Sequence, residues 1–540
     1  MGAPLPVWDG VTLLGSTARV RVRASAHAEG TCERYQWLEA HPNVTVVPTR
    51  RAQGRSPFLP SDLLDVVESG LSVPSIDEQR TRTAWIRAQV ARLPERHRAY
   101  VEHAAEALLD LFLDLGEESG PLTYRGRHGE WQAPSGALLY AWAMYFEGPG
   151  GYREVRRVRT GSAHEPDRGN RAWTLHAAQV VAQLPWSIPC ARVVVREVGA
   201  VDGSSLVHLD VSPMELAEMF ESELRPALRQ IVTGRDTTPG WDCPRCALVG
   251  RCEALIPAVR ALGQSRAGPR TRSLSAADLD AYDRCPAHWY YTRELKLRRT
   301  HRDETAIYRG VAIHEWMRRA HARATACTPD DLPADPGDQA WLPPQEYGVA
   351  RPYLIHHATR CPLEGDATTA VAIEQTYHLY DATADLIVVT KPDLVLRRGD
   401  TLVLRETKSS ETVSAGASRA EISSRYTQVN LGLSLLDSLA AHHGCVNAEF
   451  ELELLTPAGG QTWSWSTSNQ TELTVARSDI AQRVAAWQGD EIWKPAPNAL
   501  CEFCDVREWC SERDTYANSP SVSADATGND GANWRPGDPF

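Results

Sequence analysis

The sequence predicts an α/β protein that consists of two consecutive copies of one unit. The pattern C-x2-C-x5-C occurs twice, and a single cysteine precedes each occurrence by 211 and 216 residues, respectively. The later copy runs in the order helix, strands, helix and terminal cysteines, which suits a mixed sheet flanked by helices. With 540 residues, the chain has room for two units of about 250 residues, each with a substantial core.

Eight cysteines fall into the two matched sets. The first set is Cys32, Cys243, Cys246 and Cys252, and the second is Cys285, Cys501, Cys504 and Cys510. Four thiolates bind either zinc or an iron–sulfur cluster. Clustered cysteines in a chain without an export signal favour metal ligands in a reducing compartment. The other cysteines look scattered; they are Cys190, Cys327, Cys361 and Cys445.

Composition shifts set the expected boundaries. We expect a first copy over residues 1–260, a linker over 261–272, a second copy over 273–513 and a disordered tail over 514–540. The linker is small, basic and poor in apolar residues, and the tail lacks the apolar residues that a core needs.

Charge and hydropathy exclude some classes of protein. The net charge of −12 argues against a polycation that coats nucleic acid, but it does not exclude a local basic channel. No apolar run approaches the ~20 residues that cross a bilayer, and the amino terminus has no secretory pattern. We therefore expect a cytoplasmic protein with no membrane partner.

Periodicity predicts the main elements. In the second copy, Ser273 or Ser275 should cap the first helix. A helix is expected over 309–324, with Val311, Ile313 and Trp316 among its apolar positions, and an amphipathic helix over 423–443. One strand is expected over 369–380, and two strands around a turn at Gly399. The first copy has comparable helices over 101–115 and 173–184 around a strand at 152–160.

The strands around Gly399 carry the chemistry. Glu406 and Lys408 are two residues apart on a strand, so they project from the same face. The hairpin returns Glu406 towards Asp393. Two convergent carboxylates form a hard-oxygen site for Mg²⁺ or Mn²⁺, and Lys408 can orient water or stabilise charge on a phosphate. Lysine occurs at only four positions, which indicates a need here for a compact ammonium.

These motifs together resemble the PD-(D/E)XK nuclease superfamily. The resemblance lies in Pro392-Asp393, Glu406-x-Lys408, the upstream His314 and the terminal cysteines, and it covers residues 273–513. It is greatest to the RecB/AddB-like iron–sulfur branch, which includes CRISPR-associated adaptation nucleases. It implies two tandem restriction-endonuclease-like mixed-sheet cores, each closed by a four-cysteine cluster. The cofactors would be two [4Fe–4S] clusters, with zinc as the alternative, and Mg²⁺ or Mn²⁺.

The resemblance also implies roles for individual residues. His314, Asp393, Glu406 and the backbone carbonyl of Thr407 would bind the metal, and Lys408 would be catalytic. Gln428 matches a Q-x3-Y pattern on the next helix, but Gly432 stands where the tyrosine would be. The preceding strand carries Glu374, which could assist the site, but we favour a surface role for it.

The implied activity is hydrolysis of single-stranded or end-bearing DNA by a deoxyribonuclease, such as an exonuclease, in repair, recombination or defence. The chain contains no Walker A motif, so a helicase partner would be a separate chain. The last residues faintly resemble the tips with which single-strand binding proteins recruit partners. A different class stays open, namely a non-catalytic nucleic-acid-binding scaffold.

The first copy lacks this set of residues. Aligning the cysteine triplets puts Arg157 at the position of Glu406 and Arg159 at that of Lys408. We therefore expect a degenerate copy that keeps its cysteines. Its arginines at 153, 156, 157 and 159 predict either a phosphate-binding surface or a solvated face of a structural domain.

Overall fold

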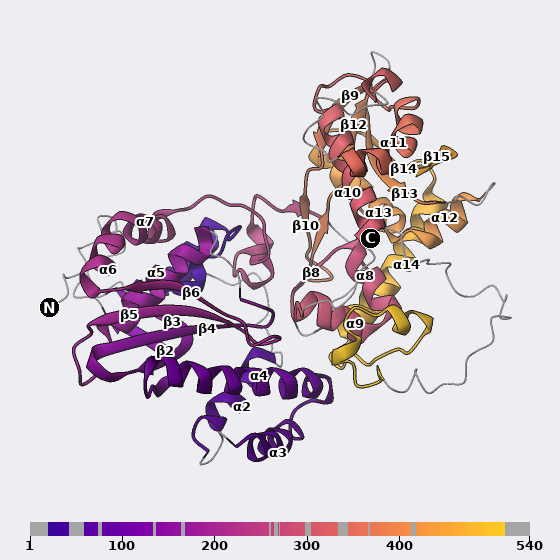
Figure 1. The fold of residues 1–540 in the computed structure, drawn as a ribbon. Helices are drawn as coiled ribbons and strands as arrows, with labels where there is room; N and C mark the ends of the chain where they lie inside the picture. The colour runs from indigo at the N-terminus through magenta and orange to yellow at the C-terminus, as the bar shows by residue number, and fades with distance from the viewer. Residues whose placement is uncertain are drawn as a thin grey trace. The chain divides into compact units, whose positions relative to one another are not determined.

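The computed structural model describes residues 20–42, 59–73, 78–132, 137–163, 168–258, 261–263, 268, 270–297, 304–332, 344–364, 368–411 and 417–513. The chain divides into two compact units, each assembled from several segments (Figure 1). Unit 1 comprises Met1–Ala254, Tyr290–Thr300 and Pro497–Tyr516. Unit 2 comprises Leu255–Trp289, His301–Ala496 and Ala517–Phe540. This division departs from a simple order of two copies, because two later segments group with the first unit.

Unit 1 is a mixed sheet with helices. Its strands are β1 (Arg21–Arg23), β2 (Thr123–Gln132), β3 (Leu138–Glu147), β4 (Tyr152–Arg159), β5 (Arg192–Gly199) and β6 (Ser205–Val211). Its main helices are α1 (Glu33–Ala40), α2 (Leu59–Gly70), α3 (Gln79–Val90), α4 (Glu95–Ser119), α5 (Arg168–Gln183), α6 (Pro213–Met219) and α7 (Arg225–Thr233).

The sheet of unit 1 has the order β1-β3-β4-β5-β6, and β2 also pairs with β3. Strands β2, β3 and β4 are antiparallel neighbours, β4 and β5 are parallel, and β6 returns antiparallel. The parallel pair needs a crossover, and α5 supplies it. Helix α5 packs on the sheet in an apolar core that includes Val155, Val193 and Val195.

Unit 2 contains two sheets. Its strands are β7 (Ile256–Pro257), β8 (Arg272–Leu274), β9 (Thr368–Ile373), β10 (Tyr377–Asp381), β11 (Leu386–Thr390), β12 (Leu394–Arg398), β13 (Thr401–Ser409), β14 (Asn447–Thr456) and β15 (Gly459–Ser466). Its helices are α8 (Ala276–Arg284), α9 (Pro286–Trp289), α10 (Glu304–His321), α11 (Pro344–Ala358), α12 (Arg419–Arg425), α13 (Thr427–His442) and α14 (Gln470–Gly489). Ser275 caps α8 and forms a capping box with Asp278.

The five-stranded sheet of unit 2 has the order β15-β14-β13-β12-β9 (Figure 1). Strands β12 and β13 form a hairpin whose two-residue turn contains Gly399, with φ 59°. Such tight hairpin turns require positive φ, which glycine adopts without strain. Strands β13 and β14 are parallel and are joined through α13. Helices α10 and α11 share an apolar core with β12, β13 and β14.

Two predicted strands are broken in the structure. The segment 369–380 divides at Glu374, where φ is 50°, into β9 and β10, which belong to different sheets. The strand expected before Gly399 divides into β11 and β12 around Lys391-Pro392-Asp393. Proline has no N–H to donate to a ladder, so it favours such a break. The smaller sheet has the order β7-β10-β11-β8.

Two predicted helices also differ. Helix α10 ends at His321, and Ala324 has φ 56°, so the expected extension to 324 is wrong. Val311 is 58% exposed and is therefore no core position. The second helix is broken at Tyr426, and α13 is buried on almost every side rather than amphipathic. Burial follows from its position, since α13 packs against β13, β14, α8 and α14.

The segment predicted as a linker is structured wherever it is described. The Leu262 N–H donates to Asp381, and the Thr271 hydroxyl donates to Asp385. Strand β8, which begins at Arg272, pairs with β11. The predicted tail at 514–540 lies outside the described residues. So do residues 298–302 of the basic stretch 293–302, which the sequence offers as a second candidate for binding phosphate. No helix in the described part of the chain is long and apolar enough to span a membrane.

Candidate active site

The β12–β13 hairpin brings Asp393 beside Glu406. Leu394 pairs with Arg405, so Asp393, directly before β12, lies level with Glu406 on β13. The Thr407 N–H donates to Asp393 Oδ2 at 2.6 Å. This bond holds the aspartate against the strand that carries the other acidic residue.

Helix α10 and strand β9 contribute two further side chains. His314 Nδ1 lies 3.0 Å from Asp393 Oδ1 and 3.3 Å from Glu374 Oε1. Glu374 follows β9, which pairs with β12, and its N–H donates to the Asp393 carbonyl. The expected surface role for Glu374 is wrong, because its side chain is only 14% exposed and it forms ion pairs with His314 and Lys391.

Glu406 and Lys408 project together from β13. Lys408 Nζ donates to Glu406 Oε1 at 2.8 Å, and both side chains are largely buried. Residues two apart on a strand share a face, which explains why this short motif forms a local pair.

Buried charges shift the pKa values of this site. Burial alone would lower the pKa of His314, but Asp393 and Glu374 raise it to about 10. Burial raises the pKa of Glu406, and Asp393 adds to this while Lys408 opposes it. Burial would lower the pKa of Lys408, but Glu406 and Asp393 raise it. The site therefore holds protonated His314 and Lys408 against its carboxylates.

The residues fit a divalent cation. One ligand atom from each of His314, Glu374 and Asp393 lies within 4.8 Å of the other two. Carboxylate oxygens with one imidazole suit Mn²⁺ or Mg²⁺. Burial and the neighbouring Asp393 carboxylate both raise the pKa of Glu406, and a divalent cation near the two carboxylates would oppose this shift.

Comparison with known proteins identifies the family of this region. Residues 273–511 match the model of the PD-(D/E)XK nuclease superfamily. Residues 273–511 are a PD-(D/E)XK nuclease superfamily domain. Such domains belong to nucleases, which are hydrolases that use divalent metals.

Other comparisons add little. No curated protein matches the chain. A solved structure titled "Crystal structure of SSO0001" is similar at 16% identity and a TM-score of 0.23, covering 45% of this chain and 86% of that chain. A likeness this weak carries no argument about substrate or mechanism.

The next helix of the nuclease domain departs from the Q-x3-Y pattern for a steric reason. Gln428 is half-buried in the first turn of α13, and its predicted role stays a prediction. A Cβ at Gly432 would lie 2.3 Å from the Phe450 ring on β14. The site of the missing tyrosine is thus a close contact between helix and sheet.

The first cysteine set assembles within unit 1. The Cys32 N–H donates to Asp242 Oδ2, which precedes Cys243 in sequence. Burial raises the pKa of the Cys246 thiol, and the nearby thiols of Cys32 and Cys252 raise it further. Backbone N–H groups also point at the sulfurs, as Gly240 does at Cys243. Hydrogen bonds of this kind tune thiolate-bound clusters.

Four thiolates suit zinc and an iron–sulfur cluster alike, so the metal of the two matched sets stays a prediction. In the second set, Cys285 belongs to unit 2 and the triplet to unit 1, so its closure stays a prediction.

Two of the four arginines predicted to bind phosphate are internal. Arg153 is 3% exposed and donates to the carbonyls of Val181, Ala182, Leu184 and Ile188. Arg156 is 1% exposed, pairs with Glu154 and lies over two phenylalanine rings. For these two arginines the predicted phosphate surface is wrong, because their guanidinium groups are buried and bonded to groups inside the unit.

The other two arginines stand at the expected positions on β4. Arg157 and Arg159 are partly exposed, and both lie beside Glu197 of β5. Their pairing with a buried carboxylate reduces the positive charge that they offer to a phosphate.

Proposed function

We propose that the protein is a metal-dependent deoxyribonuclease whose active site is in the second copy. The observation that carries the proposal is the meeting of His314, Glu374 and Asp393 beside the Glu406–Lys408 pair within a PD-(D/E)XK domain. His314, Asp393 and Glu406, with the Thr407 carbonyl, would hold Mg²⁺ or Mn²⁺, and Glu374 would assist. The cation supplies an activated water and neutralises charge on the phosphate.

Lys408 would act as a charged donor rather than as a base. The carboxylates of Glu406 and Asp393 raise its pKa, so the ammonium keeps its proton at neutral pH. It can therefore orient water and stabilise the extra negative charge that develops on the phosphate. Water adds to phosphorus and the bond to the 3′ oxygen breaks, which leaves a 5′-phosphate and a 3′-hydroxyl. His314, once it releases its proton, is free to be a ligand.

The first unit would be a degenerate copy of the nuclease fold. The pairing directions along β2-β3-β4-β5-β6 match those along β9-β12-β13-β14-β15, with a helix between the parallel strands in both. Arg157 and Arg159 lie on β4, the counterpart of β13. Because arginine cannot bind a cation, this copy would not cleave DNA.

The two cysteine sets would hold [4Fe–4S] clusters. The gathering of Cys32 with its triplet supports a four-thiolate site for the first set, with zinc as the alternative to a cluster. The substrate would be single-stranded or end-bearing DNA, and a helicase or a single-strand binding protein would be a separate partner. Processing of DNA ends in repair, recombination or defence would be the setting.

Nuclease assays test the proposal. We expect the anaerobically purified full chain with Mn²⁺ to degrade end-labelled linear single-stranded DNA. Lys408→Ala should reduce the rate at least ~100-fold, because it removes a charged donor at the reacting phosphate. Lys494→Ala is the matched control, since Lys494 is exposed and outside the site.

Equal, background-level cleavage by the wild type and Lys408→Ala would contradict the proposal. Retained DNA binding in that case would favour the non-catalytic scaffold instead.

A further inference from the structure

Four buried side chains of unit 2 converge at a place that the nuclease site does not use. They are His321, Cys327, His357 and Cys361, and they are between 0% and 4% exposed. One ligand atom from each lies within 4.8 Å of the other three. The two cysteines belong to neither matched set and look scattered in the sequence, so only folding brings them together.

The ends of two packed helices build this cluster. His321 is the last residue of α10, and Cys327 follows in the next loop. His357 lies in the last turn of α11, and Cys361 lies just beyond its end, four residues later. The spacing is therefore H-x5-C and H-x3-C, so each helix end supplies one nitrogen and one sulfur.

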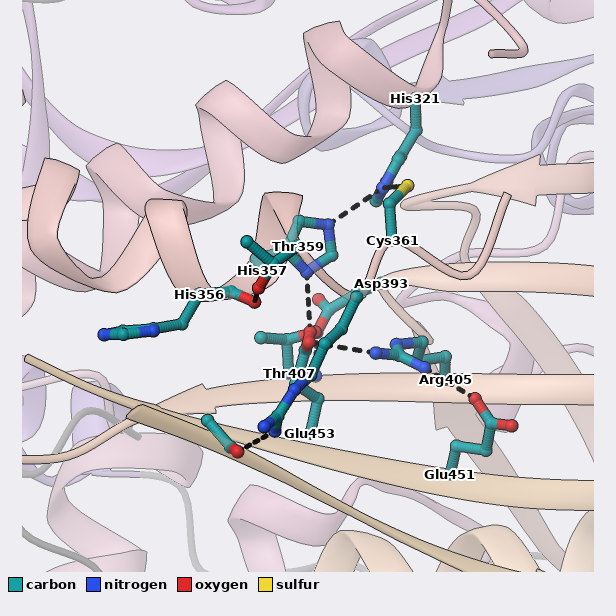
Figure 2. Close-up of polar contacts among 12 residues, drawn as sticks. His321, His356, His357, Thr359, Cys361, Asp393, Arg405, Thr407, Glu451 and Glu453 are labelled. Carbon is teal, nitrogen blue, oxygen red and sulfur yellow. Dashed lines mark hydrogen bonds and ion pairs between the residues drawn. The ribbon is translucent and has the colours of Figure 1, made fainter. Parts of the chain in front are cut away.

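The distances match tetrahedral coordination. Bond lengths of ~2.0–2.1 Å to nitrogen and ~2.3 Å to sulfur place two nitrogens ~3.3 Å apart, and a nitrogen and a sulfur ~3.6 Å apart. His321 Nε2 lies 3.1 Å from His357 Nε2 and 3.7 Å from Cys361 Sγ. Figure 2 shows these three side chains pointing towards one another.

A carboxylate orients one of the histidines. Glu453 Oε2 lies 2.7 Å from His357 Nδ1, and this glutamate is 1% exposed (Figure 2). An Nδ1–H donated to this carboxylate leaves the Nε2 lone pair facing the cluster. Zinc-binding histidines are held by carboxylates in this manner.

We propose that His321, Cys327, His357 and Cys361 bind one structural zinc ion. Two nitrogens and two sulfurs in a tetrahedral arrangement suit zinc. Four protein ligands leave no open position for water or substrate, so the role is structural rather than catalytic. The proposal does not depend on the proposed function, because none of the four residues belongs to the nuclease site.

The ion would stabilise the elements that carry the nuclease site. It would fasten the end of α10, which carries His314 two turns earlier, to α11. Glu453 extends this bracing to β13, since it forms an ion pair with Arg405 at 2.9 Å and accepts a hydrogen bond from Thr407 Oγ1 at 3.2 Å. Thr407 stands between Glu406 and Lys408.

Two metal-free arrangements compete with the zinc site. The histidines could share a hydrogen bond through their Nε2 atoms, or the two cysteines could form a disulfide. In either arrangement, the zinc content of the protein would not depend on these four residues.

Zinc content distinguishes these possibilities. The full chain should be produced in zinc-supplemented medium and its zinc measured after treatment with a weak chelator. We expect Cys361→Ser to contain one zinc equivalent less than the wild type. Cys445→Ser should match the wild type, since Cys445 is also buried but lies outside the cluster. Equal zinc in Cys361→Ser and the wild type would overturn the proposal.

A second measurement needs no variant and so does not depend on variant folding. X-ray absorption at the zinc edge of the wild-type chain should show two sulfur and two nitrogen neighbours, at ~2.3 Å and ~2.0 Å. A wild-type chain with no zinc, or with zinc bound by four sulfurs only, would rule the site out.

Discussion

At the scale of single residues, the candidate metal site is held together by ion pairs between its carboxylates and its cationic side chains. Glu374 and Asp393 share the His314 proton, and Lys391 also pairs with Glu374. Burial alone would raise the pKa of Glu374, but His314 and Lys391 lower it to about 2, so the carboxylate stays charged across the neutral range. A cation that enters this site meets a ready anionic ligand in Glu374.

Glu374→Gln should therefore weaken metal binding. We expect the Mn²⁺ concentration that gives half-maximal cleavage to rise roughly 10- to 100-fold, the usual cost of losing an outer ligand or its orienting partner. The exposed Glu364 provides the control, and Glu364→Gln should leave the Mn²⁺ requirement unchanged. An unchanged requirement in Glu374→Gln would remove this residue from the metal site.

Substitution by alanine should have opposite effects on stability at two helical glycines, Gly432 and Gly348. Gly432→Ala should lower the free energy of unfolding by ~1–3 kcal/mol, because its Cβ would meet the Phe450 ring at 2.3 Å. Gly348→Ala, in α11 with open space around its Cβ, should raise that energy by ~0.5–1 kcal/mol. Urea unfolding followed by tryptophan fluorescence measures both changes, and equal effects would disprove the packing explanation.

At the scale of elements, strand β13 carries different chemistry on its two faces. Glu406 and Lys408 project from one face, and Arg405 and Thr407 contact Glu453 from the other. Alternation along a strand makes this possible, so the proposed reacting groups and their support occupy successive residues. Any change that tilts β13 therefore moves both sets together.

Glu453→Gln should disturb this support. It removes the charge that faces buried Arg405 and His357, and breaking such buried pairs costs ~3–5 kcal/mol. Glu449→Gln is the control, because Glu449 also lies on β14 but is a third exposed and 4.0 Å from Arg398. A partly exposed pair of this kind is worth at most ~1 kcal/mol. If urea unfolding shows equal losses for the two variants, the buried network does not support β13.

At the scale of the whole molecule, each unit contains its own buried polar centre. In unit 1, His27 Nε2 lies 3.1 Å from His176 Nδ1, and both rings are buried. Burial lowers the pKa of His27 to about 4, and it lowers that of His176 well below the ordinary value. Both histidines are therefore neutral in the folded unit at neutral pH.

Acid should consequently destabilise unit 1. Below about pH 6.5 the unfolded chain binds protons that the folded unit does not, so stability falls between about pH 6.5 and 4. The shift at His27 alone corresponds to roughly 3 kcal/mol. Hydrogen exchange of β3–β5 over this pH range measures the loss. His27→Gln should flatten the dependence, whereas His128→Gln, at an exposed position, should not. An unaltered slope in His27→Gln would contradict the prediction.

Iron content tests the first cysteine set. If both matched sets hold four-iron clusters, the chain contains about eight iron atoms, and Cys243→Ser should lose about four of them. Metal analysis with the anaerobic absorbance spectrum checks this result. If the wild type contains zinc instead of iron, and Cys243→Ser loses zinc, the first set binds the alternative metal.

Features carried by neighbouring residues could be predicted from the sequence. Glu406 and Lys408 are two residues apart, and the turn at Gly399 dictates that Asp393 lies opposite Glu406, so local geometry is sufficient. Repeated cysteine spacing likewise needs no coordinates. The placement of Asp393, Glu406 and Lys408 could be predicted because a strand or a hairpin constrains its own residues, whereas the role of the cysteines stays a prediction.

Only the tertiary structure decided how distant side chains share the interior. Glu374 looks like a surface residue until pairing of β9 with β12 buries it beside His314. Arg153 and Arg156 look available for phosphate until neighbouring carbonyls and Glu154 surround them. Cys327 and Cys361 look unrelated until α10 and α11 pack together. The burial and the bonding partners of a side chain depend on contacts between segments far apart in the chain. The spacing of residues in the sequence does not reveal those contacts.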